Sequence, residues 1–304
     1  MKKSTFLLFT SVFVLAIAIS SCKKKETPVP ATTEDTTASS DNSYVEKVSN
    51  DIVSMAGQSS ENGSLSSYRK SGEGEELCGL SCATIVRDTT TKTITITFDG
   101  KQCLDGHTRS GVLVLNYAGS NGAKYYRNPG YHLVITSSNY VVDGDAITVN
   151  KTIDNTTAVG FNPTTTNLTW QITSDINVVK ANNGGTITWK GTRTKTLLNT
   201  SDTTVYHGQS IHISWDKARI GITGNATGTT AGGDNYTSTI TSQLVRDMNC
   251  SPNALHPGSH PFIQGTFDFT PGAKLVRHFN FGSGACDNDA TVTINNVVYN
   301  ITLR

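Results

Sequence analysis

Two groups of side chains have the chemistry to hold a metal ion. Asp287, Asn288 and Asp289 follow one another, and their oxygen atoms are ligands that calcium prefers. Aspartate and asparagine are also the commonest turn residues, because their side chains bond to the nearby backbone, and we favour a turn here. His256 and His260 lie four residues apart in a loop that contains a proline, without the glutamate of the metalloprotease motif. We therefore expect no metal and no cofactor.

Catalytic motifs are missing from this sequence. It contains no G-x-S-x-G, and no S-x-x-K followed by its partner motifs, which place the nucleophilic serine in two classes of hydrolase. Carboxylates are few and lie mostly in turns, which leaves no credible acid–base pair for a glycosidase. The sequence therefore favours a protein that binds rather than catalyses, and a hydrolase assembled from distant residues is the least supported alternative.

An aromatic loop is the best candidate for a binding surface. Residues 123–131 read Ala-Lys-Tyr-Tyr-Arg-Asn-Pro-Gly-Tyr, so Tyr125, Tyr126 and Tyr131 lie near Arg127. Aromatic side chains in a loop with glycine and proline are hard to bury together, and exposed aromatic clusters often mark contact sites. The alternative is a loop that packs back on the domain through its own tyrosines.

The three tryptophans have a different expected role. Flat indole rings suit sugar rings, so Trp170, Trp189 and Trp215 are candidates for a stacking platform. Each of them, however, shares its strand face with an isoleucine or leucine two residues away, and such neighbours point the same way. We therefore expect the tryptophans to lie in the core.

Cysteine usage agrees with an oxidising compartment. Five cysteines lie beyond the first thirty residues, and an odd number is satisfied by two disulfides and one spare thiol. We predict the pairs Cys82–Cys103 and Cys250–Cys286, each flanking a pair of strands, with Cys78 left free. Zinc needs two close cysteine pairs, and only one close pair occurs here.

The first 22 residues have the order of a secretory signal. Lys2 and Lys3 form a basic start, residues 6–19 are an uncharged apolar run, and Ser20-Ser21-Cys22 follows. The apolar run is shorter than the roughly 20 residues that a membrane-spanning helix needs. Small residues directly before a cysteine resemble the lipobox of bacterial lipoproteins. This resemblance implies cleavage before Cys22 and attachment of a diacylglyceryl group to its thiol.

A wider resemblance covers more of the chain. The lipobox, the lysines at 23–25, a Thr/Pro tether and a Thr-rich β domain together resemble lipoproteins of Bacteroidetes-type bacteria, and residues 281–294 are similar to an ending found in uncharacterised members. The resemblance implies an envelope protein attached to the outer membrane. The lysines depart from the acidic residues that accompany surface export in that group, so the periplasmic and surface faces both stay open.

Charge limits the partners of the chain. The sequence has 304 residues and a formal charge of +1, and loss of residues 1–21 removes two lysines. A nearly neutral chain lacks the clustered basic residues that bind nucleic acid. Lys23, Lys24 and Lys25 are expected to form a solvated collar at the membrane surface. The expected partners are the lipid bilayer, through Cys22, and a glycan or envelope protein.

The chain divides into a signal, a tether and a folded part. Residues 1–21 are the signal peptide, and residues 22–42 form a disordered tether rich in Thr, Pro and mixed charge. Residues 43–77 contain a short helix and a loop. The helix is indicated by a Ser43–Glu46 capping box and by apolar residues at helical spacing. Gly57 is the expected stop of that helix.

Residues 78–304 are expected to form one all-β domain. Apolar and polar residues alternate with period two, and Gly, Asn and Asp cluster between the alternating runs, as in antiparallel sheets. Several runs are long for strands, including 166–179, 185–199 and 234–246. We predict a single antiparallel meander that curls into a sandwich or open barrel, with one short N-terminal helix.

Three functions follow in order of support. The first is a non-catalytic binding or adhesion module, lipid-anchored in the bacterial cell envelope, and it predicts a concave or loop-borne patch that includes Tyr125 and Tyr126. The second is a structural envelope component or subunit of a larger complex, and it predicts an exposed apolar strip or an unprotected sheet edge. The third is a hydrolase, and it predicts a cleft where carboxylates or a His–Asp pair converge.

Overall fold

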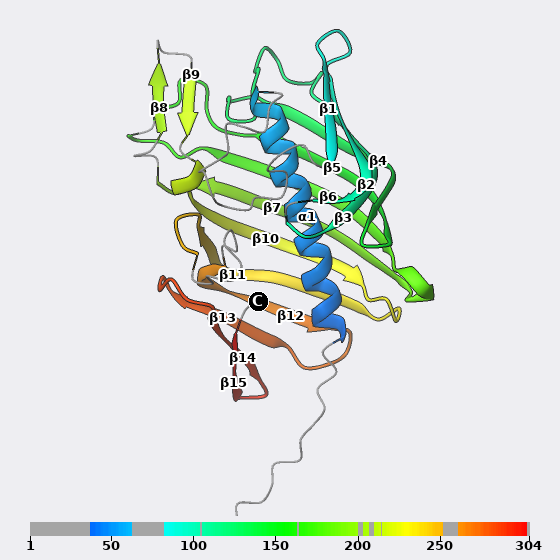
Figure 1. The fold of residues 1–304 in the computed structure, drawn as a ribbon. Coiled ribbons are helices and arrows are strands. Elements are labelled where there is room, and N and C mark those ends of the chain that lie inside the picture. Colours follow the sequence, from blue (N-terminus) through cyan, green and yellow to red (C-terminus); the bar gives the residue numbers. More distant parts are fainter. Residues whose placement is uncertain are drawn as a thin grey trace, which may run out of the picture. The chain divides into compact units, whose positions relative to one another are not determined.

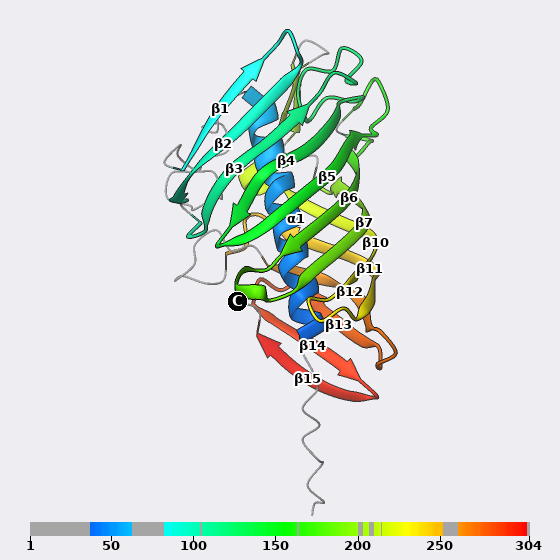
Figure 2. The same cartoon turned by 90° about the vertical axis from the view of Figure 1, so that its right-hand side faces the viewer.

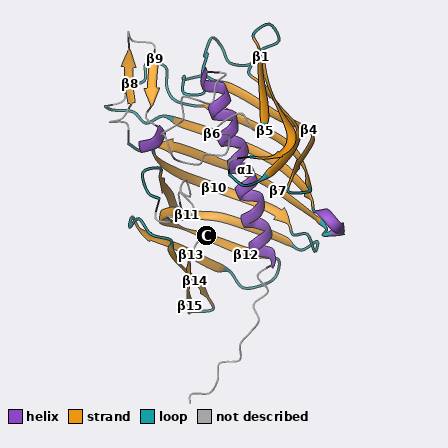
Figure 3. Cartoon of the chain, viewed as in Figure 1, coloured by secondary structure: helices purple, strands orange, loops and turns teal. Residues whose placement is uncertain are grey.

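Strands dominate the computed structural model, which is drawn by secondary structure in Figure 3. It describes residues 37–62, 82–103, 105–162, 164–199, 203–206, 210–213, 215–251 and 261–302. These residues belong to one unit, which contains a single long α-helix, α1 (Thr37–Asn62). No helix in this described part of the chain is long and apolar enough to cross a membrane.

In the described part of the chain, thirteen strands form one open antiparallel sheet, with β1 and β15 at its edges. This confirms the all-β prediction and selects a single open sheet over a sandwich. The strands follow one another in sequence order, except that β10 pairs with β7. The strands of the large sheet are β1 (Ala83–Asp88), β2 (Thr93–Gln102), β3 (Thr108–Asn116), β4 (His132–Val142), β5 (Asp145–Asn155), β6 (Thr169–Val179), β7 (Thr186–Leu197), β10 (Arg219–Thr229), β11 (Asn235–Asp247), β12 (Phe262–Pro271), β13 (Arg277–Ser283), β14 (Asp289–Ile294) and β15 (Val297–Thr302).

The segment between β7 and β10 forms a separate two-stranded sheet. It consists of β8 (Thr203–Tyr206) and β9 (Ser210–Ile213), which pair antiparallel. β9 ends at Ile213, and Trp215 begins a short 3-10 helix. Ile211 of β9 is buried and belongs to the main core.

Helix α1 lies along the inner face of the curled sheet, with strands on more than one side of it (Figures 1 and 2). It spans 26 residues, so the prediction of a short helix that begins at Ser43 and stops at Gly57 was wrong in length. Thr37 to Asn42, expected to belong to the tether, are also helical. The physical reason is burial: every residue from Met55 to Ser60 is buried, and tertiary packing outweighs the helix cost of a glycine.

The inner face of the sheet follows the period-two pattern. Trp170 and Trp189 are completely buried on it, as expected, while Trp215 is half-buried against the same core. The apolar residues of α1 at helical spacing (Val45, Val48, Ile52 and Met55) pack into this core. The long strands are also confirmed, since β6, β7 and β11 have 11, 12 and 13 residues.

A second, smaller core lies outside the region filled by α1. It is built around Leu244, Phe281 and Ala290, with phenylalanine rings from β12 and β13 packed against them. The rings of Phe267 and Phe279 stack with their centroids 4.4 Å apart. The segment from Asn280 to Thr302, called the C-terminal corner below, is therefore packed against phenylalanine side chains of β12 and β13.

Both predicted disulfides form. Cys82, before β1, is bonded to Cys103, after β2, with their Cα atoms 5.1 Å apart. Cys250, after β11, is bonded to Cys286 in the loop after β13, with their Cα atoms 5.6 Å apart. Cys78, expected to be free, lies outside the described residues, as do Cys22 and the histidines at 256 and 260.

Candidate functional site

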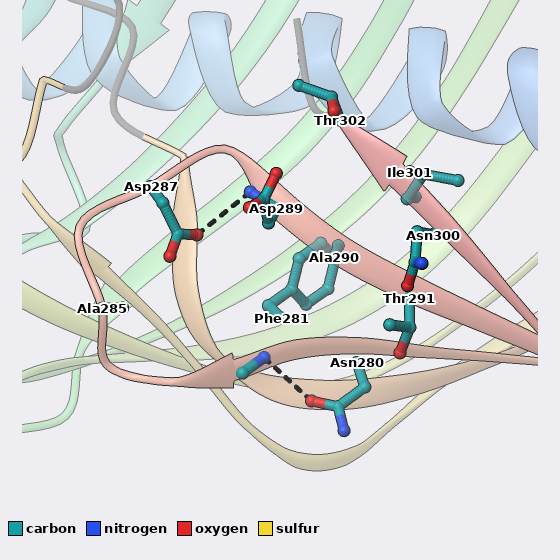
Figure 4. A pocket seen from close by; sticks show the side chains of 11 residues that line it. Asn280, Phe281, Ala285, Asp287, Asp289, Ala290, Thr291, Asn300, Ile301 and Thr302 are labelled. Carbon is teal, nitrogen blue, oxygen red and sulfur yellow. Dashed lines mark hydrogen bonds between the residues drawn. The ribbon is translucent and has the colours of Figure 1, made fainter.

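A pocket of about 470 Å³ opens in the C-terminal corner (Figure 4). This volume lies within the range of roughly 300–1,000 Å³ that is usual for small-ligand sites. Residues from β13, the following loop, β14 and β15 contribute to the wall. The described lining residues are Asn280, Phe281, Gly282, Ala285, Asp287, Asp289, Ala290, Thr291, Asn300, Ile301 and Thr302.

Local turn chemistry positions the polar groups of this pocket. The Asp287 carboxylate Oδ1 accepts a hydrogen bond from the Asp289 backbone N–H at 3.0 Å, and the Asn280 side-chain Oδ1 accepts one from Gly282 N–H at 2.9 Å. Cys286 ties the intervening loop to the end of β11 through its disulfide. The loop is therefore held by hydrogen bonds to its backbone and by a disulfide.

The wall of the pocket combines acidic, neutral polar and apolar groups. Phe281 and Ala290 are buried and supply its apolar part, while Asn300 and Asp289 are exposed. The described lining includes two aspartates and no lysine, arginine or histidine. Such a wall accepts hydrogen bonds from hydroxyl or N–H groups and disfavours an anionic ligand.

The aspartates considered as calcium ligands lie at this pocket, and they form the turn that we favoured. Asp287 and Asp289 line the pocket, and the first of them bonds the backbone of the second. Within the described ranges, no three histidine, cysteine, aspartate or glutamate side chains come together in a geometry for a metal ion. The arrangement offers carboxylate oxygens to a ligand and no built cation site.

The tyrosine loop packs back on the sheet. Tyr126 and Tyr131 are almost completely buried, Arg127 is buried, and only Tyr125 is half-exposed. The Tyr126 ring stacks on Trp170 at 5.1 Å, and the Tyr126 carbonyl accepts a hydrogen bond from the Trp170 indole N–H at 2.9 Å. Burial raises the pKa of the Tyr131 hydroxyl to about 12. Of the residues predicted to bind, Tyr125 is the one whose ring reaches solvent.

Lys195 completes an aromatic cluster beside this loop. Its ammonium nitrogen lies 5.7–5.8 Å from the ring centroids of Tyr126, Trp170 and Trp215. An ammonium at this distance is attracted by the negative faces of aromatic rings. The cluster is thus filled by a side chain of the protein itself, which indicates a structural contact.

Cationic side chains from the sheet contact α1 along most of its length. They come from five strands and from the residue after β6, and they bond carboxylates, hydroxyls or carbonyls of the helix. From the first to the last turn of α1 the pairs are Arg277–Ser39, Lys180–Asp41, Arg193–Glu46, Lys151–Ser49, Arg109–Asp51 and Arg87–Ser60.

Arg109 is the best compensated of these cations. It is 1% exposed and donates two hydrogen bonds to Asp105, at 2.8 and 2.6 Å, while Asp51 of α1 lies 3.6 Å away. Burial lowers the pKa of Arg109, but the hydrogen bonds and charge of Asp105 outweigh it and raise the pKa overall.

A glycine allows an irregularity in the same strand. Gly111, at φ +88°, lets β3 bulge close to Asn139, where a Cβ atom would collide with the backbone.

Lys151 has no such compensation. It is 1% exposed on β5, and its ammonium donates to the Ser49 hydroxyl at 2.6 Å and to the Ser49 carbonyl at 3.0 Å. Burial, together with the charge of Arg193, lowers the pKa of Lys151 to about 7. A buried amine with this pKa is a candidate functional group by chemistry, but α1 covers it.

Among the residues that the structure describes, three histidines pair with aspartates through Nδ1. The His107–Asp143 and His132–Asp154 distances are 2.6 Å, and the His278–Asp268 distance is 2.7 Å. The last two pairs lie directly opposite each other on neighbouring strands, which is a common stabilising arrangement in sheets. The Ser120 hydroxyl bonds the backbone of His132 and not its ring, so no Ser–His–Asp relay is formed there.

Comparison with known proteins found no match for this chain. No family model, no curated protein and no solved structure matches this chain. The case for a site therefore depends on the geometry described above.

Sequence reasoning missed most of the pocket and the row of cations that contact α1. Asp287 and Asp289 were singled out, but the other pocket residues come from β13, the loop after it, β14 and β15, and strand pairing brings them together. One of these cations, Lys151, did leave a signal. Lys151 has the same strand parity as Val149 and Ile153, so an inward lysine follows from the period-two pattern.

Proposed function

We propose that this protein is a non-catalytic binding module of the bacterial cell envelope, lipid-anchored through Cys22, and that it binds a neutral glycan in the pocket of the C-terminal corner. The observation that carries the proposal is this pocket, which combines carboxylate, amide and hydroxyl groups around the ring of Phe281. Sugars offer hydroxyl donors and an apolar ring face, which suit those groups.

Other features support an envelope location and a role without catalysis. The signal and the small residues before Cys22 favour export and lipidation, and two disulfides suit an oxidising compartment. The His–Asp pairs occupy cross-strand positions or turns, and none of them lines the pocket. A structural role in a larger complex is the second candidate, favoured by the exposed apolar side chains of β15.

We propose the pocket as the binding site in place of the tyrosine loop that the sequence suggested. Burial of Tyr126 and Tyr131 leaves little of that loop for a ligand, whereas Asp287 is half-buried and Asp289 exposed at the pocket. A ligand that bridges these carboxylates would also contact Asn300 and Thr302 across the opening, where Figure 4 shows them on β15.

The test is a glycan array followed by titration calorimetry with the full chain in detergent. The Asp287→Asn/Asp289→Asn double variant keeps oxygen acceptors for the turn but removes both charges. We expect it to weaken glycan binding at least tenfold, about 1.4 kcal/mol. Asp88→Asn is the matched control, because Asp88 also accepts backbone N–H bonds in a turn, at the opposite end of the sheet.

Two further results decide the alternatives. Tyr125→Ala should leave binding unchanged, since Tyr125 lies outside the pocket. Loss of binding in Tyr125→Ala with normal binding in the aspartate double variant would move the site to the tyrosine loop. Absence of any glycan ligand for the folded, disulfide-bonded chain would contradict the proposed function.

A further inference from the structure

The outer edge of the C-terminal corner is an unusually open strand. β15 pairs with β14 over six residues without a bulge, and it has no second neighbour among the described strands. Val297, Val298 and Tyr299 are 45%, 60% and 42% exposed, so apolar side chains reach solvent on both faces of this strand. Edge strands with this character are templates for pairing with another chain.

The usual protections of an edge strand are missing from β15. Proteins block their edges with charged side chains, prolines or bulges, and the sequence Val-Val-Tyr-Asn-Ile-Thr has none of them. The opposite edge, β1, carries Arg87 and Asp88. The Arg87 guanidinium lies over the ring of Tyr117 and also donates to the Ser60 carbonyl of α1.

Hairpin geometry identifies the backbone groups that face outward. Asn295 and Asn296 both have positive φ, so β14 and β15 are joined by a two-residue type I′ turn. In such a hairpin the flanking residues, Ile294 and Val297, form a hydrogen-bonded pair, and paired types then alternate along the ladder. The N–H and C=O groups of Val298 and Asn300 therefore point away from β14.

The apolar pattern of β15 is complementary to itself. Val297, Tyr299 and Ile301 lie on one face, opposite Ile294, Val292 and Ala290 of β14, all of which are buried. If a second β15 runs antiparallel with Tyr299 opposite Tyr299, then Val297 of one copy faces Ile301 of the other. The same register pairs Val298 with Asn300 of the second copy, and both have outward backbone groups.

We propose that β15 is the surface through which two copies of this chain pair, antiparallel and about a two-fold axis at Tyr299, into one continuous sheet. The self-complementary row and the absence of charge select a second copy over an unrelated peptide. Because Asn300, Ile301 and Thr302 also line the pocket, pairing places two pockets side by side. The proposal does not depend on the nature of the ligand, and its test uses none.

Disulfide trapping tests the register. Tyr299 would oppose Tyr299 at a pair without direct hydrogen bonds, where Cα atoms are about 4.5 Å apart, a distance that permits a disulfide. The full-length Tyr299→Cys variant should therefore give a cross-linked dimer on mild oxidation. Asn300→Cys is the control, because the two residues 300 are offset along the strands and cannot bond in this register. The wild-type chain, oxidised in the same way, shows how much cross-linking arises from the native cysteines.

Sedimentation of the full chain in density-matched detergent tests the surface itself. Tyr299→Lys places two like charges opposite each other, and we expect its dimer dissociation constant to rise at least tenfold. Val86→Lys is the control, since Val86 is also an exposed apolar residue of an edge strand, 59% exposed on the opposite edge, β1. A wild-type chain that stays monomeric at 100 μM, equal loss of dimer in both variants, or cross-linking in Asn300→Cys but not in Tyr299→Cys would each overturn the proposal.

Discussion

The α1-filled part of the sheet and the C-terminal corner are stabilised in different ways. In the first, strands β1 to β7 and β10 to β12 enclose a helix whose apolar and polar residues are both buried, and cations from several strands contact it. In the second, a small cluster around Leu244, Phe281 and Ala290 supports a hairpin with exposed apolar residues. From this difference in packing we expect a rigid scaffold that presents a less stable, open corner.

The two regions also differ in their main polar residues, which are buried in the scaffold and exposed to solvent in the corner. Lys151, Arg109 and Asp51 have polar chemistry that solvent and ligands do not reach. Asp289, Asn300 and Thr302 have simpler chemistry but are exposed around a pocket. Buried ion pairs are weak evidence of function, because they serve mainly to fix one arrangement of packed elements. We therefore propose that the corner binds the ligand and that the scaffold holds the corner in position.

The largest expected effect is the loss of Arg109. Arg109→Ala leaves the Asp105 and Asp51 carboxylates without their buried partner, which should lower the free energy of unfolding by about 3–5 kcal/mol. Lys101→Ala is the control, since Lys101 pairs with Asp99 on the surface, and it should change stability by about 1 kcal/mol or less. Urea denaturation measures both. Equal effects would mean that the helix contacts do not stabilise the scaffold.

A matched pair of isoleucines compares the two regions directly. Ile153→Ala opens a cavity in the scaffold, where Ile153 is fully buried, and should cost about 2–5 kcal/mol. Ile301→Ala removes a half-buried side chain in the corner and should cost about 1 kcal/mol. The same denaturation measurement decides the order, and a larger cost for Ile301→Ala would reverse the comparison.

Lys151 gives a smaller effect at any one pH near neutrality, with a distinctive pH dependence. Its pKa is about 7 in the fold and 10.5 in the unfolded chain, so between these values unfolding takes up a proton. The contribution of Lys151 to the free energy of unfolding should therefore rise with pH by about 1.4 kcal/mol per pH unit in that window and be constant below about pH 7. Lys151→Met should remove this slope.

The control for Lys151 is an exposed lysine on the next strand but one. Lys190 is 69% exposed and pairs with Asp175 at 2.8 Å, so Lys190→Met should keep the wild-type slope. Stability curves at several pH values between 7.5 and 10 measure the difference. Equal slopes for the wild type and Lys151→Met over this range would show that Lys151 stays protonated in the fold.

The sheet was predictable from the sequence because its pattern is local. Period-two alternation and Asn/Gly turns mark the strands, and cysteines that flank strand pairs led to both disulfides. The helix was predicted too short, since its polar ends are stabilised by distant groups such as Arg277 at Ser39 and Arg87 at Ser60. No pattern within the helix reports such contacts.

The site was less predictable for a related reason. The tyrosine loop was expected to be exposed because it contains Gly and Pro, yet Trp170 and Ile211 provide partners for Tyr126 and Arg127 that lie 44 and 84 residues away. The pocket needs the pairing of β13, β14 and β15 before its lining residues meet. Contacts of this range follow from the fold and not from local composition.

The most direct test of a rigid scaffold with an open corner is peptide-resolved hydrogen–deuterium exchange on the full chain at low protein concentration. We expect backbone amides of 147–153 and 170–178 to exchange slowly, near the rate set by global unfolding, and those of 297–302 to exchange much faster through local opening. Exchange of all these segments at one common rate would contradict the account, since the scaffold and the corner would then unfold as a single unit.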